Sequence, residues 1–363
     1  MRIAILTELF PPSIGGQEIR FAELAQALVQ RGHSVEVFCI QNVPGTPQEE
    51  TVTNVKIHRF PEAFNYQSPT LGQLRRRLLP LLRYALWCRD IPGDFDFVVF
   101  NEWPLVHVML ARPSIRSKAA VDWCESRDGM LFSLVQRYLP RMVRKNIANT
   151  AALKAKLQTA SGCPFEFLPS GIFPERYRSA RRSERNGILY LGRVTEHKNV
   201  PLLLSAFEAL IGKGYTGPLR IAGSGPLLLM LHEWVRASTV ANKIEVLGSV
   251  DEGAKQQLLA NSEVLLLTSR REGFPRVVAE AMASGLPVVT ADYAENGAKE
   301  LVSQYGIGQV AVSAADAVSD AILHVLDKWD RYSIACIAAS KSLNWETLVE
   351  DFLKIAKSVQ RAA

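Results

Sequence analysis

The chain has 363 residues, which is more than one hydrophobic core usually organises, so we expect two domains. Its composition of 48% hydrophobic and 21% charged residues is typical of a globular protein and excludes a disordered chain. The net charge of +6 comes from the first half: residues 1–180 carry 22 Lys and Arg against 16 Asp and Glu, whereas residues 181–363 carry 20 of each. This excess favours an acidic partner, but the sequence has no basic helix with interleaved aromatic residues, which argues against nucleic-acid binding.

Cysteine usage indicates a reducing compartment. The five cysteines are scattered, odd in number and without metal-type spacing, which favours a cytoplasmic protein. The apolar run at the start, Met1–Leu6, is too short for a signal peptide, and no segment has the length needed to span a bilayer. Any membrane contact would therefore be peripheral, at the inner face of the membrane.

The chain opens with a strand, a glycine loop, a helix and a second strand, expected at 2–6, 11–16, 17–30 and 33–40. Gly15 and Gly16 precede the helix, and such a glycine pair lets a diphosphate approach backbone N–H groups and the positive end of the helix dipole. A glycine turn that binds nothing is at least as common. The G-x-G-x-x-G spacing is absent, which argues against a nicotinamide dehydrogenase.

Further strands are expected at 55–60, 96–100, 118–123, 145–150 and 166–169. Polar and aromatic residues follow two of them, where open α/β sheets bind ligands. These candidate site residues are Glu102, Trp103, Asp122, Trp123, Glu125 and Arg127. Helix capping and loop packing are the alternative explanation.

Residues 71–89 predict a basic amphipathic helix, because five arginines interrupt an apolar and aromatic run. Such a helix binds anionic membrane surfaces. A half-buried surface helix explains the pattern equally well. The arginines are Arg75, Arg76, Arg77, Arg83 and Arg89.

Residues 170–177 lack periodicity and contain glycine and proline, so they are interpreted as a linker. Strands are then expected at 187–192, 219–222, 244–248 and 263–268, with a helix at 200–210. This second alternation of strands and helices predicts another parallel sheet. The expected fold class is α/β, with two doubly wound domains and a cleft between them.

The segment 269–289 carries the strongest chemical signal. It follows a buried strand and predicts a loop, a helix, a left-handed cap at Gly285 and another strand. Glu272 and Glu280 are too far apart to share a proton and suit two separate hydroxyl-bearing parts of one ligand. The plainer interpretation makes Glu272 a partner of the helix dipole and Glu280 a solvated helix residue. Arg193 and Lys198 follow another strand and could neutralise a diphosphate without a metal.

Taken in order, Gly192–Asn199, Ala222–Pro226 and the run Glu272–Pro275 with Glu280–Val289 resemble family 4 of the retaining, nucleotide-sugar-dependent glycosyltransferases. The loop 11–16 extends this resemblance over nearly the whole chain. It implies a GT-B fold of two Rossmann-like domains: an acceptor-side domain of residues 1–170, and a nucleotide-sugar domain of residues 171–344. The helix at about 345–363 would cross back to the first domain.

The resemblance also implies roles for individual residues. Glu272 would contact the donor sugar and Glu280 the ribose, while Arg193 and Lys198 would bind the diphosphate. The Gly15–Gly16 loop would close over the diphosphate from the first domain. Gly273, Phe274 and Pro275 would complete the donor site, and the polar residues of the first domain would serve a glycan, lipid-linked or small-molecule acceptor. No metal cofactor is expected.

The sequence departs from the family pattern at Cys124, where many relatives carry a histidine near the anomeric end of the sugar. A thiol cannot make every hydrogen bond of an imidazole, so Asp122 or Glu125 could take over, the match could be displaced by a residue or two, or the sugar preference could differ.

The expected function is transfer of a sugar, in particular a hexose. A nucleotide-sugar epimerase and a non-catalytic nucleotide-sugar binder are the alternatives.

Overall fold

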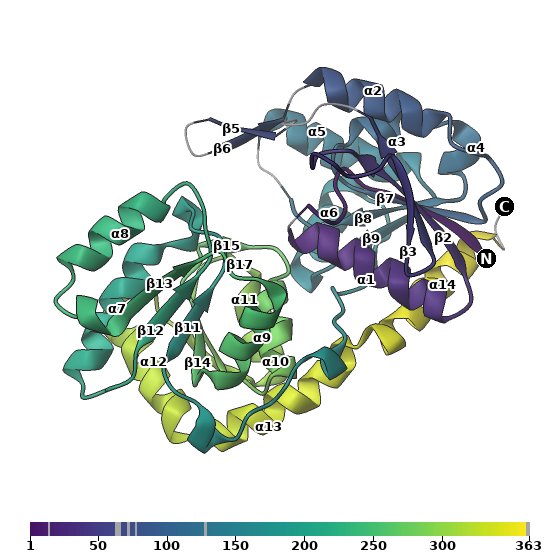
Figure 1. The fold of residues 1–363 in the computed structure, drawn as a ribbon. Helices are drawn as coiled ribbons and strands as arrows, with labels where there is room; N and C mark the ends of the chain where they lie inside the picture. Colours follow the sequence, from purple (N-terminus) through teal and green to yellow (C-terminus); the bar gives the residue numbers. More distant parts are fainter. Residues whose placement is uncertain (14, 62–66, 71–72, 77, 127–128, 361–363) are drawn as a thin grey trace. The chain divides into compact units, whose positions relative to one another are not determined.

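The computed structural model describes residues 1–13, 15–61, 67–70, 73–76, 78–126 and 129–360 (Figure 1). The chain forms two compact units. Unit 1 comprises most of residues 1–171 together with the C-terminal segment from Trp345, and unit 2 comprises Ile172–Asn344. Each unit has a parallel sheet covered by helices, which confirms the predicted α/β class.

Unit 1 is built on an eight-stranded sheet of order β10-β9-β8-β7-β1-β2-β4-β3, in which only β3 pairs antiparallel. The order runs from β1 to β2 and β4 in one direction and from β7 to β10 in the other, so β1 and β7 are neighbours at a topological switch point. The strands are β1 (Arg2–Leu6), β2 (Ser34–Ile40), β3 (Glu49–Val52), β4 (Val55–Phe60), β7 (Phe97–Asn101), β8 (Ala119–Trp123), β9 (Lys145–Ala148) and β10 (Glu166–Phe167).

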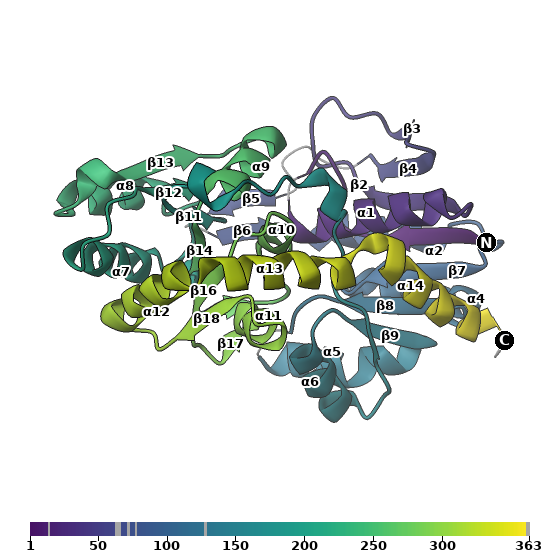
Figure 2. The ribbon, with the colours of Figure 1, turned by 90° about the horizontal axis from the view of Figure 1, so that it is seen from below.

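Helices cover both faces of this sheet. One face carries α2 (Leu78–Arg89), α3 (Val106–Leu110), α4 (Pro113–Arg116), α5 (Met130–Tyr138), the 3-10 helix η1 (Leu139–Met142) and α6 (Ala151–Ser161). The other face carries α1 (Gly16–Gln30) and the last helix, α14 (Trp345–Gln360), which lies beside α1 (Figure 2). The Trp345 indole donates to Glu23 of α1 over 3.0 Å, and Phe352 packs edge-on against Phe97 of β7. The return of the C-terminal helix to the first unit is therefore confirmed.

Unit 2 has a six-stranded parallel sheet of order β13-β12-β11-β14-β16-β18, in which β11 and β14 are neighbours at the switch point. Its strands are β11 (Ile188–Leu191), β12 (Leu219–Ala222), β13 (Ile244–Gly248), β14 (Val264–Leu267), β16 (Val288–Ala291) and β18 (Gly308–Ala311). A short parallel pair joins β15 (Arg271–Glu272) to β17 (Glu295–Asn296). The α-helices are α7 (Val200–Gly212), α8 (Leu228–Ala237), α9 (Glu252–Asn261), α10 (Arg276–Ala283), α11 (Gly297–Tyr305), α12 (Ala315–Asp327) and α13 (Trp329–Ser340).

The single helix predicted over 71–89 is wrong in its first part. Gln73–Arg76 forms strand β6, next to β5 (Gln67–Thr70), and the helix begins only at Leu78. Pro80 explains the boundary, because proline suits the first turn of a helix but its ring clashes with the carbonyl four residues earlier. Residues 71, 72 and 77, which include Arg77, lie outside the described residues, and no side chain from 67 to 78 is described.

In the part of the chain that the structure describes, no helix combines the length and apolar character needed to cross a bilayer.

Candidate functional site

The switch point of unit 2 brings together two loops that the sequence separates by some seventy residues. One follows β11 and contains Arg193 and Lys198, and the other follows β14 and contains Glu272. Thr268, at the end of β14, donates its hydroxyl to the carbonyls of Lys198 and Asn199 over 3.1 Å each. These bonds join the two loops at the sheet edge where parallel α/β folds bind ligands.

Lys198 and Glu272 form an ion pair at this edge. The Lys198 Nζ donates to the Glu272 carboxylate, and the Ser269 hydroxyl donates to the same oxygen over 2.7 Å. Both charged side chains are largely shielded from solvent. Glu272 lies in β15, outside α10, so the interpretation of this residue as a partner of the helix dipole is wrong. An ammonium group has three N–H donors, so Lys198 can hold Glu272 and still donate to an anion.

Glu280 lies on α10 and is only 4% exposed, so the solvated-residue interpretation is wrong as well. Lys255 of α9 donates to its carboxylate over 3.0 Å, and Arg276 lies 3.6 Å from the same oxygen. Burial acts to lower the pKa of Lys255, but the charges and hydrogen bonds of Glu280 and Glu252 outweigh it and raise that pKa. Lys255 is thus a charged partner that orients the Glu280 carboxylate.

Glycines allow the backbone loops of this site to approach closely. A Cβ on Gly223 would lie 1.8 Å from the Gly192 carbonyl oxygen, and one on Gly297 would lie 2.0 Å from that of Gly273. The first contact places the turn after β12 against the loop that carries Arg193, whose side chain is exposed. The second fixes the loop Gly273–Pro275 at the start of α10. Larger side chains at these glycines would displace the loops.

The switch point of unit 1 holds a hydrogen-bonded network of polar side chains. Glu102, which follows β7, accepts from the Cys124 backbone N–H over 2.9 Å and from the Gln17 side chain over 3.3 Å. Asn101 donates in turn to Gln17 over 3.0 Å, and the Trp103 indole donates to Glu8 over 3.1 Å. The network joins the loops after β1, β7 and β8.

Burial governs the protonation of this network. It raises the pKa of Glu102 to about 8, and the neighbouring charge of Glu125 acts in the same direction. Glu102 therefore carries a proton over much of the neutral range and can donate a hydrogen bond. Burial, together with the charge of Glu102, also raises the pKa of the Cys124 thiol well above its ordinary value. The thiol stays protonated, which does not suit a nucleophile.

Other residues predicted for unit 1 lie in different surroundings. Asp122 is buried against Arg20, with an Nε–Oδ2 distance of 2.8 Å, and Arg20 also donates to Ser170. Trp123 points into the core, where its indole donates to Asn146 over 3.0 Å. The structure thus places Asp122 and Trp123 inside the fold. Glu125 is half-buried at the edge of the sheet, and Arg127 lies outside the described residues.

The glycine loop of unit 1 begins α1. Gly16 is the first residue of this helix, and Gly15 precedes it in an extended conformation. The Glu18 carboxyl group lies against Gly15, in the place that a Cβ would occupy. A side chain at position 15 would therefore have to displace the Glu18 carboxyl group.

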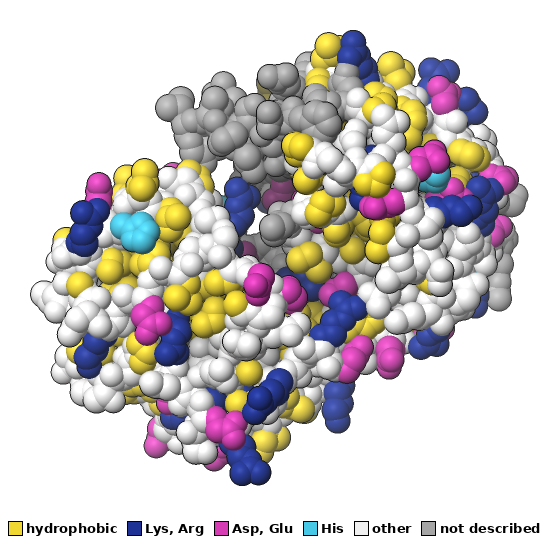
Figure 3. All heavy atoms as spheres, viewed as in Figure 1, with side chains coloured by type: hydrophobic (Ala, Val, Ile, Leu, Met, Phe, Trp, Pro, Cys, Tyr) yellow, Lys and Arg dark blue, Asp and Glu magenta, His cyan; other side chains and the backbone are white. Residues whose placement is uncertain are grey.

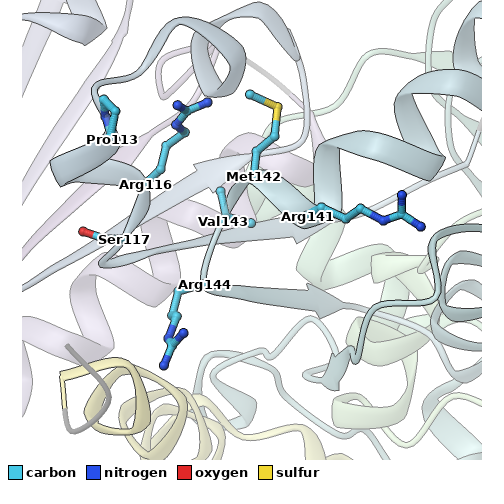
Figure 4. Close-up of a pocket in the computed structure, with 7 residues that line it drawn as sticks. All are labelled: Pro113, Arg116, Ser117, Arg141, Met142, Val143 and Arg144. Atoms are coloured by element: carbon cyan, nitrogen blue, oxygen red, sulfur yellow. The ribbon is translucent and has the colours of Figure 1, made fainter.

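A pocket of about 620 Å³ lies at the opposite edge of the unit 1 sheet, ahead of β8 and β9. It is lined by Arg116, Arg141 and Arg144 together with Pro113, Ser117, Met142 and Val143 (Figure 4). The three guanidinium groups point in different directions (Figure 4). They do not converge on one ligand, so this pocket is a weaker candidate than the switch points.

Sequence reasoning missed Ser269, Lys255 and Gln17. Ser269 stands directly before the Glu272 loop, and its position three residues from a predicted site carboxylate was the available signal. Lys255 and Gln17 gave no such signal, because each reaches its partner from a helix that is distant in sequence.

The fold is similar to the folds of several solved structures. The sucrose-phosphate synthase of Thermosynechococcus elongatus has a TM-score of 0.80 at 17% identity, with 100% of each chain covered. The Anabaena protein HepE, solved with UDP and glucose, has a TM-score of 0.77 at 17% identity, with 99% of this chain and 100% of that chain covered. These likenesses define the fold as GT-B.

Two family models match the sequence: "Glycosyltransferase Family 4" over residues 14–176, and "Glycosyl transferases group 1" over residues 173–341. The chain therefore belongs to family 4 of the glycosyltransferases, and the predicted resemblance is confirmed. It is 24% identical to an uncharacterized glycosyltransferase of Methanocaldococcus jannaschii over 98% of both proteins. It is 21% identical to a GDP-mannose-dependent alpha-mannosyltransferase of Mycobacterium tuberculosis over 97% of this chain and 95% of that protein.

Proposed function

We propose that this enzyme transfers a hexose from a nucleoside-diphosphate donor to a hydroxyl group with retention of anomeric configuration, and without a metal ion. The observation that carries the proposal is the set of paired charges at the unit 2 switch point, where Lys198 is bonded to Glu272 and Lys255 to Glu280. Two oriented carboxylates suit sugar and ribose hydroxyls, and the cations beside them suit a diphosphate.

In the proposed mechanism, Arg193 and Lys198 bind the diphosphate and stabilise the charge that develops on it as the sugar leaves. Glu272 holds the sugar hydroxyls, Glu280 holds the ribose, and the loop Gly273–Pro275 lines the donor. The acceptor hydroxyl attacks from the face on which the diphosphate departs, and its proton passes to the departing diphosphate. The ordered backbone and carboxylates present these groups in advance, so little reorganisation is needed during transfer.

On the acceptor side, we propose that unit 1 supplies the polar groups. Glu102, Trp103 and Glu125 stand at the carboxyl ends of β7 and β8. Cys124 would take the place of the family histidine. The Gly15–Gly16 loop would add contacts to the diphosphate. A glycan, a lipid-linked glycan or a small molecule would fit, and a cytoplasmic location with peripheral contact to an anionic membrane would bring a lipid-linked acceptor within reach.

Donor identity is the first property to measure. We expect one of the UDP, GDP, ADP or TDP sugars to raise the melting temperature of the protein, since a ligand that binds only the folded state stabilises it. The Glu280→Gln variant should lose most of this shift. If none of the nucleotides or nucleotide sugars stabilises the wild-type protein, the proposed donor site is wrong.

Replacing Lys198 by alanine tests the catalytic role. We expect the turnover number to fall by roughly 10²–10³-fold, because a positioned donor to developing charge contributes about that much. The assay follows release of nucleoside diphosphate from the donor identified by thermal shift, and NMR of the products separates transfer or hydrolysis from epimerisation.

Lys354→Ala, which removes an exposed lysine on α14, serves as the control and should retain full turnover. A Lys198→Ala variant that is folded and turns over at the wild-type rate would exclude this role.

A further inference from the structure

The helix layer on one face of the unit 1 sheet presents large apolar side chains to solvent. On α5, Met130 is 85% exposed, Leu131 70% and Leu134 50%. On α2, Leu79 is 57% exposed, Leu82 37% and Leu86 48%. We call these six residues the α2–α5 surface. In most soluble proteins exposed apolar residues are scattered singly, so a gathering on the helices of one layer indicates a binding surface.

The spacing of these residues shows that α2 is apolar on two sides. Leu81, Tyr84 and Cys88 of α2 point into the core, while Leu79, Leu82 and Leu86 recur at helical spacing on the opposite side. A surface helix that only covers a core needs polar residues on its outer side. The outer sides of α2 and α5 are apolar beyond what packing of unit 1 requires.

The two helices belong to one continuous layer. Helix α3 packs against α2 and against η1, and η1 continues directly from α5. All of them lie on the same face of the sheet, above it in the view of Figure 1. Met109 and Leu110 of α3, in the same layer, are exposed as well. The α2–α5 surface is therefore presented on one side of unit 1.

The charged residues within the helices of this layer all have one sign. Helices α2, α3, α4, α5 and η1 contain no Asp or Glu, but they contain five arginines. Figure 3 shows hydrophobic side chains next to Lys or Arg side chains over α2. Arg137 and Arg141 lie beside the aromatic ring of Tyr138 at the end of α5, within 6 Å of its centroid. An apolar surface with arginines and a tyrosine at its border matches the interface of an anionic bilayer.

We infer that the α2–α5 surface docks unit 1 on an anionic lipid bilayer, with the leucine and methionine side chains entering the headgroup region and the arginines contacting lipid phosphates. Charge complementarity favours this occupant over a neutral protein surface, since each arginine near an anionic leaflet adds to the attraction. The inference gives a structural basis to the membrane contact in the proposed function. It does not depend on which sugar is transferred.

The test is co-sedimentation of the full chain with vesicles, without donor or acceptor. We expect strong binding to vesicles of phosphatidylcholine with phosphatidylglycerol, at least about tenfold weaker binding to phosphatidylcholine alone, and weakening at high salt. The variant Leu131→Ser/Leu134→Ser should reduce binding to the anionic vesicles about tenfold or more. Arg137→Gln should reduce it several-fold.

The matched control is Leu229→Ser/Met230→Ser, which removes two exposed apolar residues from α8 of unit 2 and should bind as the wild type does. Unfolding curves of every variant establish that each is folded. Absence of wild-type binding to anionic vesicles, or wild-type binding by the folded α5 variant, would overturn the inference. The inference would also be overturned if the wild type were a dimer in solution and the α5 variant a monomer. In that case a second copy of the chain would occupy the α2–α5 surface. Donor hydrolysis is measured in parallel without vesicles, so lipid docking and catalysis can fail independently.

Discussion

At the scale of single residues, Glu102 couples the unit 1 site to pH. Its pKa rises from 4.5 in the unfolded chain to about 8 in the fold, chiefly through burial. The folded state therefore holds the proton more tightly, and the stability that this provides is complete below pH 4.5 and lost as the pH rises through about 8. At about 1.4 kcal/mol for each pKa unit, the change amounts to several kilocalories per mole.

We predict that Glu102→Gln gains stability relative to the wild type as the pH rises from 5 to 9, because glutamine keeps the shape and cannot ionise. Urea unfolding at pH 5, 7 and 9 measures the difference. Glu175→Gln, at an exposed position, should show no such trend. If the difference in unfolding free energy between Glu102→Gln and the wild type were the same at every pH, burial would not raise the pKa of Glu102.

The candidate site residues that the sequence singles out most clearly lie within one continuous motif. Glu272, Gly273–Pro275 and Glu280 could be singled out because their order and spacing lie within ten residues. Their partners could not, since Lys255 and Lys198 reach them from other elements. Asp122 differs from these residues: its place at a strand end suggested a site residue, and in the structure it is buried in a pair with Arg20.

At the scale of elements, Arg185 joins two helix ends in unit 2. It is buried and donates to the carbonyls of Leu259 and Ser262 at the end of α9, to that of Ser284 at the end of α10, and to that of Ala180. Carbonyls at helix C-termini have no partner within the helix, and a cation there also meets the negative end of the dipole. Arg185 thereby helps to fix α10, which carries Glu280.

We predict that Arg185→Met lowers the free energy of unfolding by about 3 kcal/mol, because it leaves several buried carbonyls without a donor. Urea denaturation monitored by circular dichroism measures this loss. Arg178→Met removes a side chain that is 80% exposed and should change the free energy by less than about 0.5 kcal/mol. Equal stability of the two variants would mean that water satisfies the carbonyls.

Strands and helices were predicted correctly where the hydrophobic periodicity was uninterrupted. They were predicted wrongly where a proline moved a helix boundary or where a strand lacked apolar alternation. The strands β1, β2, β7, β8, β11 and β14 lie within one or two residues of their expected limits. The helix predicted over 71–89 begins late because of Pro80, and the short antiparallel strand β3 was missed because Glu49–Val52 lacks apolar alternation.

At the scale of the whole molecule, α14 completes unit 1 from the other end of the chain. The Trp345 side chain is fully buried, donates to Glu23, and packs so closely on Gly171 that a Cβ there would lie 2.5 Å from the indole. We predict that Trp345→Ala destabilises unit 1 by about 3–5 kcal/mol, as expected for loss of a large buried aromatic side chain.

Hydrogen exchange measured by mass spectrometry checks this prediction, with faster exchange expected in peptides of β1, α1 and β7 and unchanged exchange in β11–β14. The reciprocal variant, Trp329→Ala, removes a buried tryptophan of unit 2 and should produce the opposite pattern. If Trp345→Ala lost protection equally in both units, α14 would stabilise more than unit 1 alone.

The sequence by itself determined the α/β class, the alternation of strands and helices, and the glycosyltransferase family, because periodicity and compact motifs are local properties. The tertiary structure decided which loops meet. Strand order places the loops after β11 and β14 side by side, and those after β1 and β7 likewise. It also decided that Lys255 and Lys198 bond to the two glutamates and that α2 and α5 carry apolar outer sides. These contacts depend on packing between segments distant in the chain, which no local pattern encodes.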